Sequence, residues 1–315
     1  QTSHPIQNAA NSVTLVTAAQ MNAMGARTLS DVLKMLPATQ ILNRRNGLDS
    51  VMIRGIPSGR NTKILLMIDG VPHEEVIFGE WSPDEQIQLA DIDHVEIIRG
   101  PGSALYGSNA YAGIISIYTK NANATNSQVS VTMGDYGEKR LGFSYGLVTN
   151  RTNYMGNGSF FRTDGYPMQA DRYGNPTDHN NAVHAYDVHF KMKNEHWQAS
   201  LSVNDYGTEY PLYPDNENKT QDYTFIESNV KHVNNWQYVG LESQLYMYNV
   251  QRFFDHKVVD KNGGLDFYAT SKLNTTLFGF RNQVNYKFSR QENFIAGLLL
   301  ERQCVSHYDE TAIID

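Results

Sequence analysis

Residues 92–120 read IDHVEIIRGPGSALYGSNAYAGIISIYTK, and this stretch decides how the first part of the chain folds. Runs of aliphatic and β-branched residues at 95–98 and 114–118 predict strands on either side of a glycine-rich connection. The connection and its borders contain Gly100, Pro101, Gly102, Gly107 and Gly113. Glycines this dense suit a backbone that turns tightly or packs closely on another segment. A phosphate-binding loop is disfavoured, because neither GxxxxGK[ST] nor GxGxxG joins a strand to a helix here.

The residues before this stretch predict a small domain of mixed helix and strand. Apolar residues recur at helical spacing over 29–36, where Thr28 or Ser30 can cap the start of the helix and Pro37 ends it. The predicted strands lie near 13–17, 51–54, 64–68, 95–98 and 114–118. We therefore expect a mixed α/β domain over residues 1–121.

The composition of the 315-residue chain excludes several classes of protein. The formal net charge is −7 without a basic stripe, which argues against nucleic acid as a partner. Cys304 is the single cysteine, so no internal disulfide framework or cysteine metal site is expected. The apolar runs are shorter than the roughly 18 residues of a membrane-spanning helix. No catalytic constellation is apparent and HExxH is absent, so we do not expect an enzyme.

After residue 121, two-residue alternation replaces the helix signals. Trp197, Ala199 and Leu201, for example, alternate with polar residues. One apolar and one polar face, strand after strand, is typical of a membrane barrel with lipid outside and water inside. A soluble β-sandwich would alternate as well. About nine strands are predicted, at 127–134, 139–148, 152–163, 182–193, 196–206, 222–233, 236–250, 274–289 and 292–305.

The links between these strands fall into two length classes. Links of two or three residues alternate with long links at about 164–181, 207–221 and 251–273. Bacterial outer-membrane barrels have short periplasmic turns and long outer loops. The alternation of link length therefore favours the barrel over the sandwich.

Four stretches, in the same order along the chain, resemble the family of TonB-dependent outer-membrane receptors. They are TLSDVL with Leu-Pro at 28–37, MIRG at 52–55, LMIDGVP at 66–72, and RGP, ALYG and AGII within 99–115. The resemblance implies a plug domain at 1–121. Residues 122–315 would then form the N-terminal portion of an antiparallel transmembrane β-barrel, with about nine of an expected 22 strands.

The resemblance also implies a function: energy-coupled uptake of a scarce nutrient across the outer membrane of a Gram-negative bacterium, driven by a periplasmic TonB-type protein. An iron-siderophore complex is the expected cargo, with cobalamin, haem and oligosaccharide as alternatives. The family's TonB box is not evident in residues 1–12. Nine strands cannot close around such a plug, so we expect a longer polypeptide or a second chain. The rival hypothesis is a truncated plug-bearing binding module without transport.

The resemblance assigns roles to particular plug residues. Arg54 and Arg99 would anchor the plug to inward-facing barrel glutamates, since a guanidinium binds a carboxylate in a fixed, bidentate geometry. Glu242 and Glu301 are the glutamates expected as mid-strand partners in this chain, and the usual partners are otherwise expected in barrel strands outside it. The residues expected to shape the turns of the plug are Gly55, Asp69, Gly70, Gly100, Pro101, Gly107 and Gly113.

Ligand contact is expected at the outer turns of the plug and on the outer loops. Arg44 and Arg45 would attract an anionic chelate, while His73 and Trp81 belong to a second outer turn in which the indole would stack on an aromatic ligand. The loop tyrosines expected in this role are Tyr166, Tyr173, Tyr210 and Tyr213. Some cobalamin receptors of the family bind Ca²⁺ in such loops, but no DxDxDG spacing occurs here, so solvated carboxylates are favoured over a metal site.

Overall fold

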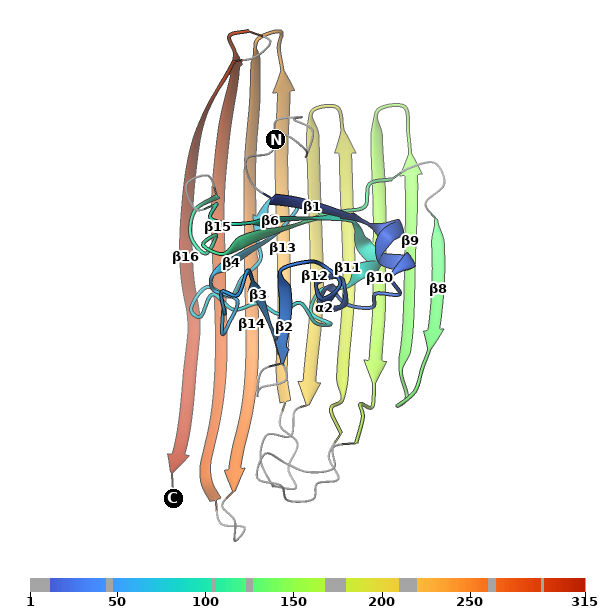
Figure 1. The fold of residues 1–315 in the computed structure, drawn as a ribbon, viewed down its shortest axis with the longest axis vertical. Helices are drawn as coiled ribbons and strands as arrows, with labels where there is room; N and C mark the ends of the chain where they lie inside the picture. The colour runs from blue at the N-terminus through green and yellow to red at the C-terminus, as the bar shows by residue number, and fades with distance from the viewer. Residues whose placement is uncertain are drawn as a thin grey trace.

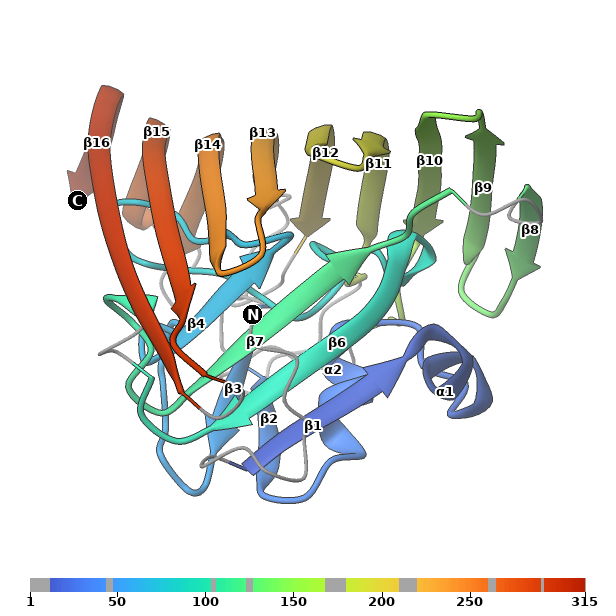
Figure 2. The same ribbon diagram turned by 90° about the horizontal axis from the view of Figure 1, so that it is seen from above.

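The computed structural model describes residues 12–43, 48–102, 106–122, 127–167, 180–209, 220–259, 265–289 and 292–314. The described strands form a five-stranded, a two-stranded and a nine-stranded sheet. The two small sheets and their helices make one compact unit, which lies against a single face of the nine-stranded sheet (Figures 1 and 2). We call the compact unit the plug and the nine-stranded sheet the barrel wall.

The plug contains both predicted and unpredicted elements. Its elements are β1 (Ser12–Thr17), α1 (Ala18–Ala23), α2 (Leu29–Lys34), β2 (Thr39–Asn43), β3 (Asp49–Ile53), β4 (Ile64–Ile68), β5 (Val71–Pro72), η2 (Leu89–Asp91), β6 (Ile92–Arg99) and β7 (Gly113–Thr119). The main sheet has the order β1-β6-β7-β4-β5, and its β4–β7 pair is parallel. The sequence did not predict α1, β2, β5 or η2.

Local chemistry explains why α2 begins where it does. The Thr28 hydroxyl accepts a hydrogen bond from the Asp31 N–H, and the Asp31 carboxylate accepts one from the Thr28 N–H, which forms a capping box. Leu29, Val32 and Leu33 then face the plug core and are fully buried. No helix among the described residues is long and apolar enough to cross a bilayer.

The glycine-rich connection brings β6 and β7 together as an antiparallel pair. At Gly113 the close approach leaves no room for a side chain, because a Cβ there would lie 2.7 Å from the carbonyl oxygen of Ile98. Ile97 and Ile115, which face each other across this pair, are fully buried. The predicted strands at 95–98 and 114–118 are therefore part of the plug's central sheet.

The barrel wall is an antiparallel meander in which each strand pairs with the next along the chain. Its strands are β8 (Gln128–Met133), β9 (Lys139–Val148), β10 (Thr152–Thr163), β11 (Val183–Asn194), β12 (Trp197–Glu209), β13 (Thr220–Asn235), β14 (Val239–Val259), β15 (Leu265–Lys287) and β16 (Asn293–Ile314). This layout confirms the predicted nine strands of an antiparallel partial barrel. The predicted domain boundary at residue 121 lies between β7 and β8 and stays a prediction.

The predicted long link at 251–273 is wrong. β14 continues to Val259 and β15 already begins at Leu265, and the two remain paired along these ends. The polar and apolar alternation weakens there, as in Gln251 to Asp255, which is why the sequence suggested a loop. Backbone pairing does not need that alternation once a strand extends beyond the membrane.

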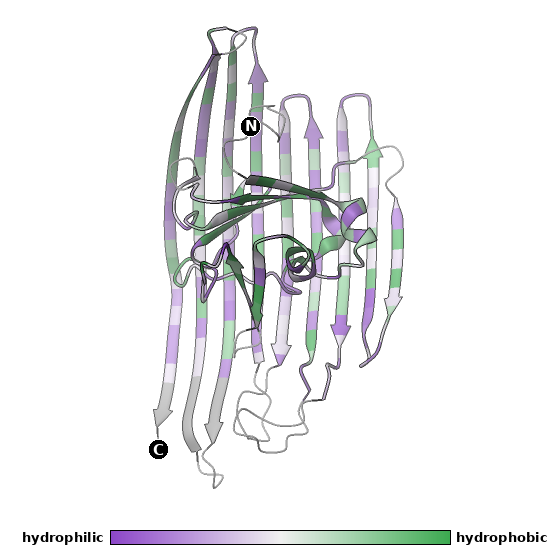
Figure 3. Cartoon of the chain, viewed as in Figure 1, coloured by the Kyte–Doolittle hydropathy of each residue, from purple (hydrophilic) through white to green (hydrophobic). Residues whose placement is uncertain are grey.

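Hydrophobic and hydrophilic residues alternate along the strands of the barrel wall (Figure 3), so its two faces differ in polarity. In β11, Val188 and Phe190 point away from the plug and are 60% and 49% exposed, whereas His189 and Lys191 point toward it and are almost fully buried. An apolar outer face and a polar inner face suit a wall between lipid and a protein-filled lumen. The fold therefore places its polar side chains where the plug can bind them.

A charge on the outer face should impair membrane insertion. Val188→Lys is expected to cost about 2–4 kcal/mol, the penalty for a cation near the bilayer midplane. The measurement is heat-modifiable gel migration of the membrane-inserted full-length protein. Gln283→Lys, on the inner face of β15, is the matched control and should insert normally. Equal insertion of the two variants would contradict the assignment of the faces.

Candidate functional site at the plug–barrel interface

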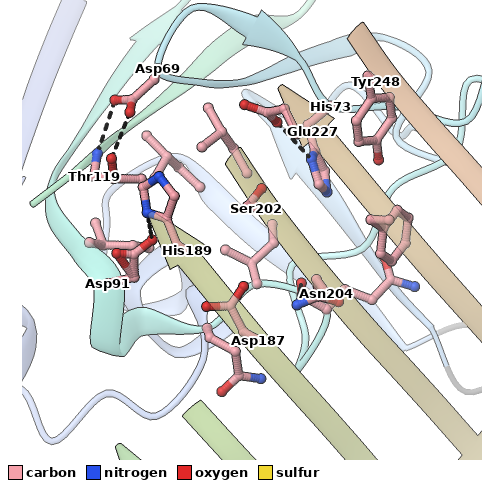
Figure 4. Close-up of a pocket in the computed structure, with 17 residues that line it drawn as sticks. Asp69, His73, Asp91, Thr119, Asp187, His189, Ser202, Asn204, Glu227 and Tyr248 are labelled. Atoms are coloured by element: carbon pink, nitrogen blue, oxygen red, sulfur yellow. Dashed lines mark hydrogen bonds and ion pairs between the residues drawn. The ribbon is translucent and has the colours of Figure 1, made fainter. Parts of the chain in front are cut away.

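A cavity of about 60 Å³ lies between the plug and the barrel wall. Figure 4 shows acidic and histidine side chains from both sides pointing toward it. Its polar lining consists of Asp69, His73, Gln86, Gln88, Asp91 and Thr119 from the plug, and of Asp187, His189, Ser202, Asn204, Glu227 and Tyr248 from the barrel wall. A cavity this size exceeds the roughly 10–15 Å³ that one water needs, so it is a polar, hydratable site.

The strongest contact at this interface is the buried ion pair of Asp69 and Lys191. The Lys191 Nζ lies 2.8 Å from the Asp69 carboxylate, and the two side chains are 3% and 4% exposed. Thr119 completes the site: its hydroxyl donates to Asp69, and its hydroxyl and carbonyl oxygens both accept from Lys191. The turn after β4, with positive φ at Asp69 and Gly70, places this carboxylate against β11.

The environment of Asp69 favours its ionised form. Burial alone would raise the pKa of this carboxyl, but the charge of Lys191 and the hydrogen bonds from Lys191 and Thr119 outweigh burial and lower the pKa. Asp69 therefore remains an anion while the plug is seated. A buried charge of this kind is stable only with its partner in place.

A second buried contact joins η2 to β10 and β11. The Asp91 carboxylate lies 2.5 Å from Nδ1 of His189 and accepts a 3.0 Å hydrogen bond from the Asn157 amide. His189 is 4% exposed. Lys120 donates its N–H to the Asp91 carbonyl oxygen, so the same residue also connects η2 with the end of β7.

A third contact joins the segment before η2 to β9. One nitrogen of Arg140 donates to both carboxylate oxygens of Glu85, at 2.9 and 3.1 Å, and the other donates to Gln88. The guanidinium also lies 4.2 Å from the ring centre of Phe161. Burial raises the pKa of Glu85, and Arg140 opposes that rise. The three contacts together attach the plug to the β9–β11 part of the barrel wall.

His73 adds a titratable group whose hydrogen bonds are not satisfied. It is 7% exposed, and neither ring nitrogen has a hydrogen-bond partner among the described residues. Glu227 lies 3.9 Å from Nδ1, and the ring packs against Tyr248 and Phe225. Burial lowers the pKa of His73 to about 3, so its imidazole is neutral when the plug is seated.

Arg54 and Arg99 lie close together at the edge of the plug. Arg54 is exposed with a positive φ, and its guanidinium lies near Gly100. Arg99 is 5% exposed and donates to the hydroxyl of Thr14 on β1. Burial and the neighbouring charge of Arg54 lower the pKa of Arg99. The role of both arginines as anchors to the barrel stays a prediction.

The predicted ligand residues do not come together in the described part of the structure. Trp81 is 2% exposed in the plug core, and its indole N–H donates to the Ile64 carbonyl, so its position does not support stacking on a ligand. His73 belongs to the buried interface. Tyr166 is 53% exposed beyond the end of β10, and its role stays a prediction. The other predicted ligand residues lie outside the described residues, and they are Arg44, Arg45, Tyr173, Tyr210 and Tyr213.

Most of the predicted turn residues have a left-handed backbone, and Gly113 lies at a close approach of two strands. Positive φ values occur at Gly55, Asp69, Gly70, Gly100 and Gly107. Pro101 follows Gly100, and Gly113 is the position of close approach to Ile98. Asp69 has a second role that the turn pattern did not show, because its carboxylate binds Lys191.

The residues that sequence reasoning missed lie on the polar faces of strands. Asp187, His189 and Lys191 share one face of β11, and Arg140 lies on the matching face of β9. Alternation marked these faces as inward, but it did not show which polar residues would be buried. A lysine or histidine on an inner face, next to an apolar outer face, was the available signal.

Two other chemical possibilities find no support. The run GFSYG at 142–146 has the Gly-x-Ser-x-Gly spelling of a hydrolase nucleophile elbow. It lies inside β9, whereas the elbow requires a sharp turn between a strand and a helix. Among the described residues, no group of three or more His, Cys, Asp or Glu could hold a metal ion.

Removing Lys191 should loosen the plug. Lys191→Met leaves the buried Asp69 carboxylate without its cation, at an expected cost of about 3–5 kcal/mol. The urea concentration at which a protease begins to cleave the plug measures this loss. Lys193→Met, an exposed lysine two residues along β11, is the control. The double variant Asp69→Asn with Lys191→Met should recover part of the loss, and a Lys191→Met plug as resistant as the control would contradict the assignment.

His73 should make plug docking sensitive to acid. A released plug would protonate this histidine near its ordinary pKa of 6.5, whereas the seated plug holds its pKa at about 3. The contribution of His73 to docking is therefore complete above pH 6.5 and is lost as the pH falls from 6.5 toward 3. Protease protection of the plug across this range should fall less steeply in His73→Gln than in the exposed-turn control His196→Gln. Identical profiles would refute this role.

Comparison with known proteins agrees with this architecture. Residues 5–114 match the family model "TonB-dependent Receptor Plug Domain". The chain is 31% identical over 178 residues to the vitamin B12 transporter BtuB of Vibrio vulnificus, covering 54% of this chain and 28% of the relative. It is 29% identical over 206 residues to the vitamin B12 transporter BtuB of Photobacterium profundum, covering 62% and 32%. The chain thus spans about a third of the length of these curated relatives.

Solved structures share the fold. The unliganded ferric citrate transporter FecA matches with a TM-score of 0.77 at 12% identity, over 98% of this chain and 50% of FecA. The copper transporter OprC matches with a TM-score of 0.71 at 15% identity, over 95% and 47%. All four of these proteins are named as transporters. The plug motifs, the plug model over residues 5–114 and the shared fold support a TonB-dependent outer-membrane receptor.

Proposed function

We propose that this chain acts in energy-coupled uptake of a nutrient across the outer membrane, with the plug as the element that moves. The observation that carries the proposal is the polar character of the contact between the plug and β9–β11. Lys191, His189 and Arg140 of these strands bind plug carboxylates, and the main apolar core of the plug lies within the plug itself. Polar groups can exchange their partners for water when they separate, so this side of the interface can open at little cost. Release of the whole plug must also expose a second apolar cluster, in which Leu48 and Val71 of the plug pack against aromatic residues of the barrel wall.

The force that opens the interface would come from a periplasmic TonB-type protein. The N-terminal strand β1 lies at the edge of the plug sheet, next to β6. Tension on the chain before β1 would therefore act on an edge strand first. A seated plug with Arg54 and Arg99 as further anchors would be the resting state of this receptor.

The cargo is proposed to be a metal chelate. The family resemblance favours an iron-siderophore complex, while the curated relatives of similar sequence are named as vitamin B12 transporters. At about 30% identity the sequence relatives are the more specific support, so cobalamin is the first cargo to test and a ferric siderophore the second. The structural matches, at 12% and 15% identity, support the fold and do not choose between these cargoes.

Uptake by intact cells tests the proposal. The full reading frame is expressed in a Gram-negative strain that lacks its own cobalamin and siderophore receptors. We expect labelled cyanocobalamin, or else a ferric siderophore, to accumulate in the cells, and to stop accumulating when the TonB gene is deleted. The controls are the empty vector and a receptor from which residues 12–119 have been removed. Cargo binding at the surface without TonB-dependent accumulation would instead support a binding module without transport.

A further inference from the structure

The inner face of the barrel wall carries a continuous row of aromatic rings beneath the plug. The ring centres of Tyr206 on β12 and Tyr223 on β13 lie 6.2 Å apart. The rings of Tyr223 and Phe225 follow at 5.7 Å, with planes only 5° from parallel. Phe225 and Tyr248 of β14 continue the row at 6.2 Å and 13°. All four side chains are buried, and we call them the aromatic row.

The aromatic row leads along the wall to the plug–barrel cavity. Tyr206 and Tyr223 are paired in the strand register, near the ends of β12 and β13 at the predicted outer link between these strands. Phe225 and Tyr248 lie further from that link and line the cavity. The row therefore joins the outer part of the wall to the cavity near its middle.

The plug covers the aromatic row with mainly aliphatic side chains. Leu48 and Val71 belong to the same apolar cluster, and Val76 packs against it. The ring of His73 lies 5.4 Å from that of Phe225 and 4.7 Å from that of Tyr248. Aliphatic contacts of this kind do not require a chain of flat rings, so seating the plug does not by itself explain the row.

The hydroxyl of Tyr248 is not used while the plug is seated. The side chain is fully buried, and its hydroxyl has no hydrogen-bond partner among the described residues. A buried polar group without a partner costs free energy. Movement of the plug would give this hydroxyl access to water or to a cargo. A tyrosine ring, which has a flat apolar body and a polar tip, suits a surface that becomes wet.

The cavity end of the row disfavours a cargo with several negative charges. Asp187 and Glu227 of the barrel wall line the cavity (Figure 4). Within the described part of the chain, neither forms an ion pair with a lysine or an arginine, and Lys191 is already bound to Asp69. A multiply anionic cargo would meet these carboxyl groups without a cation to offset them, which selects against it.

We propose that the aromatic row is the transit surface of the lumen, along which a cargo with flat conjugated rings and no net negative charge passes once the plug has moved. Successive rings offer several similar stacking contacts, and a path of many weak sites lets a cargo enter and also leave. The row is buried under the plug, so it is distinct from the contacts expected at the outer turns and loops. This inference rests on the proposed uptake function and narrows the class of cargo.

Uptake kinetics test the transit surface. The full-length receptor is expressed in a Gram-negative strain without its own cobalamin and siderophore receptors, and the probe is labelled cyanocobalamin, which has conjugated rings and no net charge. The test variant, Tyr223→Leu with Phe225→Leu, keeps apolar contact with the plug but removes two rings. Its maximal uptake rate per folded receptor should fall by roughly tenfold, the effect of losing two stacking contacts. Surface binding of the probe, measured in cells without TonB, should keep the same half-saturating concentration.

The matched control makes the same chemical changes on the lipid-facing side of β15. Phe278→Leu with Tyr286→Leu should transport at the unaltered rate, because both rings are exposed on the outer face. Protease protection of the plug in urea should be equal in the leucine variant and the control, which excludes a loosened seat. A ring-preserving variant, Tyr223→Phe with Tyr248→Phe, should retain the unaltered rate. If the double leucine variant does not reach the membrane, Tyr206→Leu alone should lower the rate by roughly threefold.

The outcomes separate this inference from the uptake function itself. Equal maximal rates in the leucine variant and the control would overturn the transit surface, as would a full loss in the phenylalanine variant. TonB-dependent accumulation of an anionic ferric siderophore in place of cyanocobalamin would overturn the class of cargo. Accumulation of neither compound by the unaltered receptor would refute the proposed uptake function, and the transit surface with it.

Discussion

Two charges buried between separate parts of a chain must meet, because an unpaired charge in that position costs several kcal/mol. Asp69 comes from a turn at the end of β4, and Lys191 comes from the middle of β11. Their contact fixes the plug against the barrel wall and brings Thr119 into the same site. The neighbouring contacts of Asp91 and Glu85 extend along the same side of the plug, so they depend on the same seating of the plug.

The barrel strands contact lipid on one face and the plug on the other. β11 presents Val188 and Phe190 to lipid and His189 and Lys191 to the plug, so most of its inner face is polar. The plug compensates with its own core, in which Val51, Ile97 and Ile115 are fully buried. The polar contacts with β9–β11 can be exchanged for water, while Leu48 and Val71 of the plug add apolar contact with aromatic residues of β12–β14. This combination fits the proposal that the plug is held in place at rest and moves during uptake.

Much of the architecture could be predicted from local pattern. The glycine-rich stretch between β6 and β7 and the alternation of the nine barrel strands both report local backbone geometry, and both were predicted correctly. The site could not be predicted in the same way, because Asp69 and Lys191 are brought together only by tertiary structure. The turn pattern predicted the turn at Asp69 but not the ion pair that the Asp69 carboxylate forms with Lys191. The extended ends of β14 and β15 were missed because hydrogen bonds between strands need no hydrophobic alternation.

If uptake requires the plug to leave its seat on β9–β11, a reversible crosslink between the plug and these strands should block uptake. A Cβ at Gly142 of β9 would lie 3.8 Å from that of Ala90 in η2, a separation that suits a disulfide once the Ser130 hydroxyl, 2.8 Å from the same Cβ, rotates away. The variant carries Ala90→Cys and Gly142→Cys, with Cys304→Ser to remove the native thiol. The account predicts that cells expressing it lose cargo uptake when the disulfide is formed and regain it on reduction. Undiminished uptake by the fully crosslinked receptor would contradict the account.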